Sequence, residues 1–273
     1  MRNLVTSLTV LSTCIKSICL TLCLCVMSQA AEDPSLVLYF DFEEGGGDTV
    51  EDRSDYGNDG TIEGDAVRGD GKIGKGLEID IGSFVLVPDS DDFKITDELT
   101  LACWVKPTDF APEAWQGNTL DFLVCRWNWG QGDHRCYEMY LQSHKPALVV
   151  SSDGTDGGSS VVAAAEPIAL DQWVNIIGIF DGSKVKIYVD GEEKGAEDHK
   201  GNIFAGEGPI IIGDNNFGGA PDFHFVGAID EVAVYDRVLN QHEIEAKIAR
   251  GHAAEVDPEG KLSTVWAHVK SQY

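Results

Sequence analysis

The chain has 273 residues and carries 46 Asp and Glu against 20 Lys and Arg, which gives a formal net charge of −26. Because proteins bind the phosphate backbone of nucleic acids through Lys and Arg, this charge argues against nucleic acid as a partner. Hydrophobic residues make up 43% of the chain and are spread along it, which excludes intrinsic disorder. The 30 glycines, with few helical patterns, favour strands joined by tight turns.

The N-terminal segment has the pattern of a secretory signal. Residues 1–31 contain no acidic residue, residues 17–27 form a short apolar run, and small residues follow up to Ala30. The run is too short to cross a bilayer, which needs about 20 apolar residues. We therefore predict cleavage after Ala30, a secreted or cell-envelope location, and no membrane insertion of the mature chain. The alternative is a retained N-terminal anchor, which Lys16 within the segment disfavours.

Removal of residues 1–30 leaves Cys103, Cys125 and Cys136 of the seven cysteines. In an exported, oxidising setting, three cysteines can form one internal disulfide at most. Cys125 and Cys136 flank a Gly-containing segment that is typical of a hairpin or loop, so we predict a disulfide between them. Cys103 lies among apolar residues in the sequence LTLACWV, which predicts a buried free thiol.

Short apolar or alternating runs, separated by Gly, Asp and Asn, predict about eleven or twelve strands with no helices between them. Asp181-Gly182 and Asp190-Gly191 are typical of hairpin turns. This pattern predicts an all-β fold, an antiparallel two-sheet β-sandwich. The runs are residues 36–42, 76–81, 84–88, 99–105, 122–126, 137–142, 147–151, 172–180, 184–190, 209–213 and 225–235.

One short helix follows the strands. Asn240 and Glu243 have the spacing of a capping box, and Gly251 is placed to end the helix. We therefore predict one folded domain over residues 31–251 after the signal segment. Residues 252–273 form a polar tail with some helical spacing, which is either a docking helix or a flexible end.

The order of the segments resembles the laminin-G-like jelly-roll domains of the concanavalin A-like lectin/glucanase superfamily. The motifs that carry the resemblance are LVLYFDFEEGGGDTVEDRSDYGNDGTI, GKIGKGLEIDIGSFVLVPDS, TLACWVKPT, QWVNIIGIFDGSKVKIYVDGEE, IIIGDNN and FVGAIDEVAVYDRVLNQHEI. They span about residues 36–250, nearly the whole mature chain. The resemblance implies a jelly roll, but it does not fix a function, because this fold hosts lectins, hydrolases, adhesion modules and structural domains.

The sequence does not carry a complete catalytic motif. Hydrolases that this chain resembles place several carboxylates on one strand, where one attacks and another donates a proton. The nearest match, Glu78-Ile79-Asp80, lacks the third acid, so we interpret Glu78 and Asp80 as the solvated face of an edge strand. Trp104 and Trp173 lie in alternating strands, and we expect both to face the core between the sheets.

These observations predict a secreted, non-catalytic binding module for a carbohydrate or a cell-surface partner. The alternatives are a structural or adhesive domain of a surface assembly and, least favoured, a glycoside hydrolase. Trp115, Trp127 and Trp129 lie in a polar, Gly-rich stretch, where exposed aromatic residues are expected. We predict that Trp127 and Trp129 form a ligand surface with Asn215 and Asn216. The alternative is that these tryptophans fold inward and close one end of the sandwich.

The resemblance also implies a structural Ca²⁺, which many members of the superfamily hold. Calcium takes six to eight oxygen ligands, usually from carboxylates, amides and carbonyls in loops. The first and last strands of a jelly roll are commonly neighbours, which would bring Asp230 beside the loop after the first strand. We therefore name Glu43, Asp52 and Asp230 as candidate ligands. The alternative is that Asp230 bonds backbone amides and the other acids are solvated.

Overall fold

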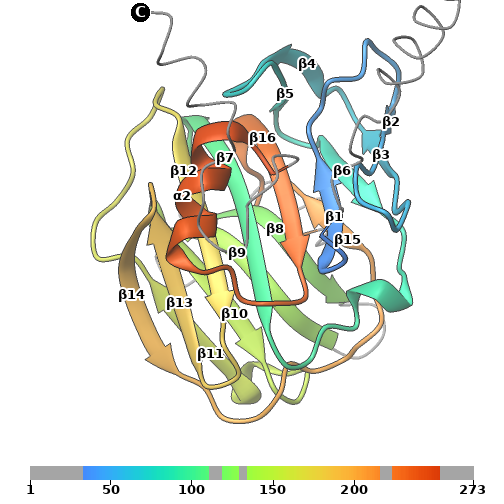
Figure 1. Cartoon of the computed structure of the whole chain (residues 1–273). Helices are drawn as coiled ribbons and strands as arrows, with labels where there is room; N and C mark the ends of the chain where they lie inside the picture. The colour runs from blue at the N-terminus through green and yellow to red at the C-terminus, as the bar shows by residue number, and fades with distance from the viewer. Residues whose placement is uncertain (1–32, 111–118, 129–133, 216–222, 253–273) are drawn as a thin grey trace, which may run out of the picture. The chain divides into compact units, whose positions relative to one another are not determined.

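The computed structural model describes residues 33–110, 119–128, 134–215 and 223–252, which fold into two antiparallel sheets packed face to face (Figure 1). The predicted jelly-roll sandwich is therefore confirmed. Sheet A contains β14 (Glu192–Asp198), β13 (Lys184–Val189), β12 (Val174–Phe180), β7 (Leu99–Asp109), β16 (Val226–Tyr235), β5 (Lys75–Ile79) and β4 (Val67–Asp70), with β1 (Leu36–Phe40) also paired to β16. Sheet B contains β11 (Ser159–Ala163), β10 (Lys145–Ser151), β9 (His134–Gln142), β8 (Leu120–Asn128), β15 (Ile210–Ile212), β6 (Phe84–Val87), β3 (Gly60–Glu63) and β2 (Thr49–Val50).

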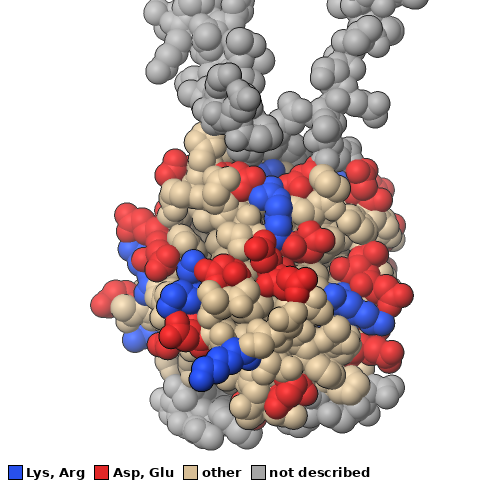
Figure 2. Space-filling view, turned by 60° about the horizontal axis from the view of Figure 1, so that its bottom comes forward, with Lys and Arg blue, Asp and Glu red and all other residues tan. Residues whose placement is uncertain are grey.

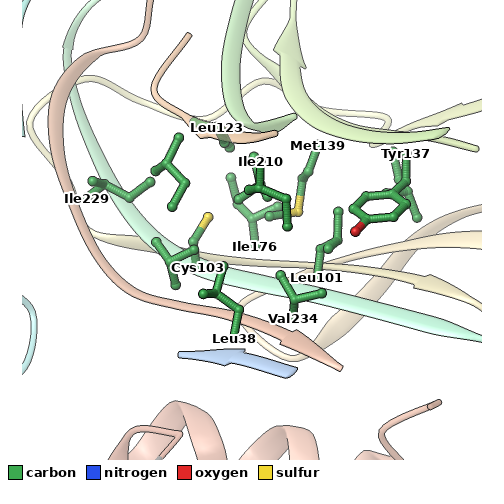
Figure 3. Packing of buried hydrophobic residues seen from close by; sticks show 14 of the residues in the cluster. Leu38, Leu101, Cys103, Leu123, Tyr137, Met139, Ile176, Ile210, Ile229 and Val234 are labelled. Atoms are coloured by element: carbon green, nitrogen blue, oxygen red, sulfur yellow. The ribbon is translucent and has the colours of Figure 1, made fainter. Parts of the chain in front are cut away.

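The core lies between the inner faces of the two sheets. Alternate residues of each strand point to this layer, as the period of two requires. Leu101 and Cys103 of sheet A meet Leu123, Met139 and Ile210 of sheet B there (Figure 3), and all five are fully buried. Each large aliphatic side chain buried in this way contributes roughly 1.5–3 kcal/mol to stability.

The two tryptophans that were expected in the core lie on the outer face of sheet A, so that prediction is wrong. Cys103 takes the inward position, and alternation turns Trp104 outward. The Nζ atom of Lys72 lies 4.3 Å from the centre of the Trp104 ring, and that of Lys106 lies 5.8 Å from Trp173. These cation–π contacts cover the rings from outside the sandwich.

The predicted hairpin turns are confirmed. Asp181 joins β12 to β13, and its N–H donates to the carbonyl of Lys184 at 3.1 Å. Asp190 and Gly191 join β13 to β14 with φ angles of 50° and 83°, the left-handed pair that a two-residue turn of this kind requires. The strands that the sequence did not predict are β2, β3, β4, β11 and β14.

Strand β16 has an unusual second edge. Along its first edge it pairs with β7, whereas its second edge is divided between two partners. Gly227–Ile229 pair with β5, and Val232–Tyr235 pair with β1, so the first and last strands are neighbours as predicted. Asp230 and Glu231 lie at the junction, where the register shifts and Glu231 adopts a φ of 53°. This β-bulge re-aims both carboxylates.

Helix α2 (Gln241–Arg250) covers the outer face of sheet A over β12, β7 and β16 (Figure 1). The predicted capping box of Asn240 and Glu243 is present, and Gly251 ends the helix with a φ of 81°. Within the described ranges, no helix is long and apolar enough to cross a bilayer. The predicted signal segment and the tail beyond residue 252 lie outside the described residues, so both domain boundaries stay predictions.

Candidate ligand-binding site

The outer face of sheet B carries a cluster of aromatic and apolar side chains, which we call the floor. The strand register places Phe122 of β8 opposite Tyr140 of β9, with 5.1 Å between their ring centres. Phe223 packs edge-on against Phe122 at 6.2 Å. The members of the floor are Phe122, Cys125, Trp127, Tyr140, Ala147 and Val149, and all are buried. The floor therefore lies on the face turned away from the main core.

Charged side chains gather at the end of the floor that Trp127 occupies. Glu138 of β9 lies opposite Cys125 and is buried, and its Oε1 is 2.9 Å from Nε of Arg135. Nη1 of Arg135 lies 2.5 Å from Oδ1 of Asp156, which begins a 3₁₀ turn, η3 (Asp156–Gly158), between β10 and β11. The same guanidinium lies 4.1 Å from the centre of the Trp127 ring. One arginine thus joins two carboxylates and an aromatic ring.

A second pair of polar side chains, an aspartate and a histidine, lies beside this group. Gly213 follows β15, and its carbonyl accepts from the N–H of Phe225 at 3.0 Å, which brings the neighbouring Asp214 and His224 together. Oδ2 of Asp214 lies 3.0 Å from Nδ1 of His224, and both side chains are buried. We call these five residues the charged cluster: Arg135, Glu138 and Asp156 of the first group, with Asp214 and His224.

The charged cluster lies close enough to the floor to affect the pKa of the Cys125 thiol. Burial raises the pKa of this thiol well above its ordinary value. The carboxylates of Glu138 and Asp214 raise the pKa further, whereas Arg135 lowers it. The charges from β9 and from the segment after β15 therefore converge on one strand of the floor, and Cys125 remains an unreactive thiol.

The predicted ligand residues are in this region, but those described are buried. Trp127 is 8% exposed, and Arg135 covers one face of its ring. Asn215 is buried beside Asp214. Trp127 is therefore buried on the outer face of sheet B rather than between the sheets, and it offers no open platform. Trp115, Trp129 and Asn216 lie outside the described residues.

Sequence reasoning missed the charged cluster itself. Glu138 and Arg135 belong to a strand that was recognised only in part, and Asp156 was assigned to no element. One signal was available: Glu138 interrupts the apolar run of β9 at an outward position. A carboxylate in a sheet that is covered on both faces requires a partner, because burying an unpaired charge is costly.

The predicted disulfide is wrong. Cys125 belongs to the floor and Cys136 to the main core, so their side chains lie on opposite faces of sheet B. Both are buried free thiols, as is Cys103, for which the prediction is confirmed. A disulfide needs Cβ atoms about 4 Å apart and pointing toward each other, which opposite faces do not allow. Sγ of Cys136 instead accepts a hydrogen bond from Arg126 at 3.3 Å.

Two of the predicted calcium ligands hold the hairpin between β4 and β5. Oδ2 of Asp230 accepts from the N–H of Ile73 at 2.9 Å, and Oε1 of Glu43 accepts from the N–H of Lys75 at 2.7 Å. The bond from Ile73 to Asp230 agrees with the alternative expectation, in which Asp230 bonds backbone amides. Both carboxylates therefore already have N–H donors, which compete with a cation for their oxygens.

The third predicted ligand is committed to its own loop. Oδ1 of Asp52 accepts from the N–H of Tyr39 and Ser54, each at 2.9 Å, and Oδ2 accepts from the N–H of Asn58 at 2.8 Å. Over the described ranges, no group of three or more His, Cys, Asp or Glu residues could hold a metal ion. The three predicted residues therefore do not fit a shared calcium site.

Calcium binding elsewhere in the chain stays a prediction, and melting curves test it. A site with free Ca²⁺ at 100 times its dissociation constant stabilises the fold by about 2.7 kcal/mol. We expect a rise in melting temperature with calcium relative to chelator, and we expect Asp52→Asn to leave the size of that rise unchanged. Identical curves with calcium and with chelator would contradict calcium binding by this protein.

The carboxylates at the junction in β16 form a separate buried network. Glu231 accepts from the hydroxyl of Tyr39 at 2.9 Å and from the N–H of His252 at 2.8 Å. The ring of His252 lies 3.0 Å from the Tyr235 hydroxyl. Burial raises the pKa of Asp230 to about 7, raises that of Glu231 and lowers that of His252 to about 3. This network ties β1 and the end of the domain to β16.

Comparison with protein families gives one match. The model of the concanavalin A-like lectin/glucanases superfamily matches residues 80–245, more than half of the chain. No curated protein matches the sequence.

Solved structures share the fold at low sequence identity. Domain 4 of AbnA, an extracellular GH43 arabinanase from Geobacillus stearothermophilus solved with arabinotriose, is 21% identical, with a TM-score of 0.55 over 80% of this chain and 100% of that one. The binding domain of Paraclostridial Mosquitocidal Protein 1 is 15% identical, with a TM-score of 0.60 over 78% of this chain and 52% of that one. The binding domain of Botulinum Neurotoxin DC in complex with SialylT is 10% identical, with a TM-score of 0.60 over 79% of this chain and 51% of that one. This chain thus spans about half of each toxin domain.

Proposed function

The chain belongs to the concanavalin A-like lectin/glucanase superfamily, and from this membership we propose that it is an exported, non-catalytic binding module whose ligand is a carbohydrate. The fold alone does not decide among the functions that the superfamily hosts. The proposal therefore rests on the chemistry of the outer face of sheet B.

The observation that carries the proposal is the charged cluster beside an aromatic floor. Sugar hydroxyls bond to carboxylate and guanidinium groups, and polar groups of this kind orient a ligand beside an apolar surface. The cluster reaches solvent through Arg135 and Asp156, whose side chains are 15% and 75% exposed. A ligand that contacts these two residues would join a network that continues inward to Glu138.

Several structural neighbours support a binding role. The arabinanase domain was solved with arabinotriose, and the binding domain of Botulinum Neurotoxin DC was solved with SialylT and with rat synaptotagmin II. These ligands belong to those proteins. They make a carbohydrate the first candidate class for this chain and a cell-surface protein the second.

The absence of catalysis is part of the proposal. Glu78 on β5 and Asp80 directly after it are exposed, as predicted, but β5 lies between β4 and β16 and is not the predicted edge strand. Glu138 is engaged by Arg135, and Asp214 by His224. Each of these two carboxylates thus already has a partner within the cluster. Release of reducing sugar from any tested polysaccharide would contradict this part.

Export follows from the N-terminal segment and places the module where extracellular glycans occur. The mature chain recovered from culture medium is expected to begin at Ala31, which N-terminal sequencing measures. A chain that remains in the cell with residues 1–30 attached would contradict export.

A glycan array with the full-length protein tests the binding function. We expect hits on a defined set of oligosaccharides, and we expect Arg135→Gln to weaken binding at least about tenfold, because hydrogen bonds from a charged donor contribute roughly 1.5–3 kcal/mol. Arg53→Gln is the matched control, since Arg53 also bridges two carboxylates, Asp41 and Glu51, but follows β2, the edge strand at the other end of sheet B from β9–β11. Melting curves check that both variants fold.

A blank array would count against the carbohydrate function and favour a protein partner or a structural role. Equal binding by the Arg135 and Arg53 variants would place the ligand elsewhere on the domain.

A further inference from the structure

We propose that the ligand is a neutral oligosaccharide and that the site rejects sugars that carry a carboxylate or sulfate. This inference rests on the proposed carbohydrate function and names the class of ligand. It follows from the way in which the cations of sheet B are already used.

Sheet B offers few cations to a ligand. Over its described strands, the Lys and Arg residues are Arg126, Arg135 and Lys145. Arg126 points into the main core, where its Nη2 lies 3.0 Å from Asp89. Lys145 lies opposite Gln142, at the other end of the β9–β10 pair from Arg135. Arg135 is therefore the cation of this sheet that stands in the charged cluster.

Two of the three guanidinium nitrogens of Arg135, Nε and Nη1, already face carboxylates. Glu138 and Asp156 lie within 2.9 Å and 2.5 Å of its guanidinium nitrogens, and Trp127 covers one face of the group. At either of these nitrogens an anionic sugar would have to displace a carboxylate, and the displaced group would lose its ion pair. Arg135 thus positions carboxylates rather than offering an open anion site.

The remaining groups of the cluster favour hydroxyl donors. Three carboxylates, those of Glu138, Asp156 and Asp214, face one arginine and one histidine that is paired with Asp214. A sugar hydroxyl can donate to the exposed carboxylate of Asp156 without displacing Arg135 from it. A ligand carboxylate would instead meet like charges, which lowers its affinity and makes the site selective by repulsion.

The charge of the whole chain acts in the same direction. The formal net charge is −26, and on the face shown in Figure 2 the carboxylates outnumber the Lys and Arg side chains. Such a field slows the approach of anionic ligands, most strongly at low ionic strength, and leaves the approach of neutral ligands unchanged.

Paired glycans test the inference on the full-length protein. The neutral probes are arabino-, xylo-, gluco- and galacto-oligosaccharides, and the acidic probes are oligogalacturonides and sialyllactose, each measured at low and at high salt. We expect binding among the neutral probes, with an affinity that does not change with salt. We expect acidic probes to bind at least about tenfold more weakly at low salt.

A charge-reversed variant locates the effect. Asp156→Lys removes one carboxylate and releases a donor of Arg135, so we expect the ratio of acidic to neutral affinity to rise about threefold to fivefold. Asp70→Lys is the matched control: it changes the net charge equally, and Asp70 is 95% exposed on β4 of sheet A. Melting curves check the folding of both variants.

The outcomes are separable. Preferred binding of acidic probes by the unchanged protein would overturn the inference and leave the carbohydrate function standing. An equal shift in both variants would assign selectivity to net charge and overturn the role of the cluster. Absence of binding to every probe would overturn the carbohydrate function and this inference together.

Discussion

Substitution of Asp89 by alanine is expected to lower the free energy of unfolding by about 3 kcal/mol, because it leaves a buried guanidinium without its counterion. The side chain of Arg126 is 1% exposed, and Asp89, at 38%, is its carboxylate partner at 3.0 Å. The partial exposure of Asp89 places the loss near the lower end of the range for buried pairs. Urea unfolding measures it.

Replacement of Arg126 itself is expected to change the free energy of unfolding much less. Arg126→Met removes the buried charge and keeps much of the volume, so we expect a change within about 1 kcal/mol, or a gain in stability. In that background Asp89→Ala should have little further effect. Asp91→Ala, which breaks an exposed pair with Lys94, is the control and should leave the unfolding midpoint in place. A loss for Arg126→Met as large as that for Asp89→Ala would show that the pair stabilises the fold outright.

The second large effect is a pH dependence that Asp230 imposes. Burial raises its pKa to about 7 from 3.8 in the unfolded chain, so the folded state retains a proton that the unfolded state has lost. Stability from this group therefore falls as pH rises from about 4 to about 7. Burial of Glu231 acts in the same direction. Burial of His252 lowers its pKa to about 3, so its contribution is lost as pH falls below 6.5 and opposes the other two.

A comparison with Asp230→Asn isolates the aspartate from these neighbours. The amide cannot ionise, and the hydrogen bond that it loses to a backbone N–H changes stability equally at every pH. We expect the stability of the variant relative to the unchanged protein to rise by about 3 kcal/mol between pH 5 and pH 8. Denaturant unfolding at the two pH values measures the difference. A constant difference would mean that Asp230 ionises at its ordinary pKa.

Asp181→Asn serves as the matched control. Burial raises the pKa of Asp181, but hydrogen bonds from Lys186 and from the turn outweigh it and lower the pKa to about 2. Asp181 is therefore ionised in both the folded and the unfolded chain from pH 5 to pH 8, and the effect of its substitution should not change over that range.

The fold was predictable because its core strands show the alternation of inward and outward residues that packing between two sheets requires. β7 alternates small or apolar inward residues with outward ones, and the turns at Asp181 and Asp190 require residues that accept left-handed backbone. The acidic strand β14 gave no such signal. It is an edge strand whose side chains are mostly exposed and include Glu193 and Asp198, which bond to polar side chains of β13, so no apolar residue is needed there.

Two predictions were wrong because they depend on which face of a sheet a side chain occupies. Trp104 was assigned to the core by its size, although the inward phase of β7 belongs to Cys103. The disulfide was assigned by the loop between Cys125 and Cys136, although a bulge in the β8–β9 pair turns Cys136 to the core face and leaves Cys125 outside. A one-residue change of phase moves a side chain to the opposite face, and composition does not reveal it.

The charged cluster was not predictable as a group. Two members come from β9, one comes from the turn before β11, and the other two lie between β15 and β16. Only the pairing of the strands brings them together. Glu138 was the one member whose sequence context indicated that its carboxylate requires a partner. The identity of that partner, Arg135, depends on a contact over Trp127 that no spacing rule specifies.

The place of β16 between β7 on one side and β5 and β1 on the other determines when the domain can fold. Until this last strand has been synthesised, β1, β5 and β7 lack the neighbour that joins them, although they were made much earlier. Closing such distant pairs is entropically unfavourable and places folding on the millisecond-to-second scale typical of β-sandwiches. The sheet that joins the two ends of the domain therefore cannot close in a nascent chain until its C-terminal part emerges.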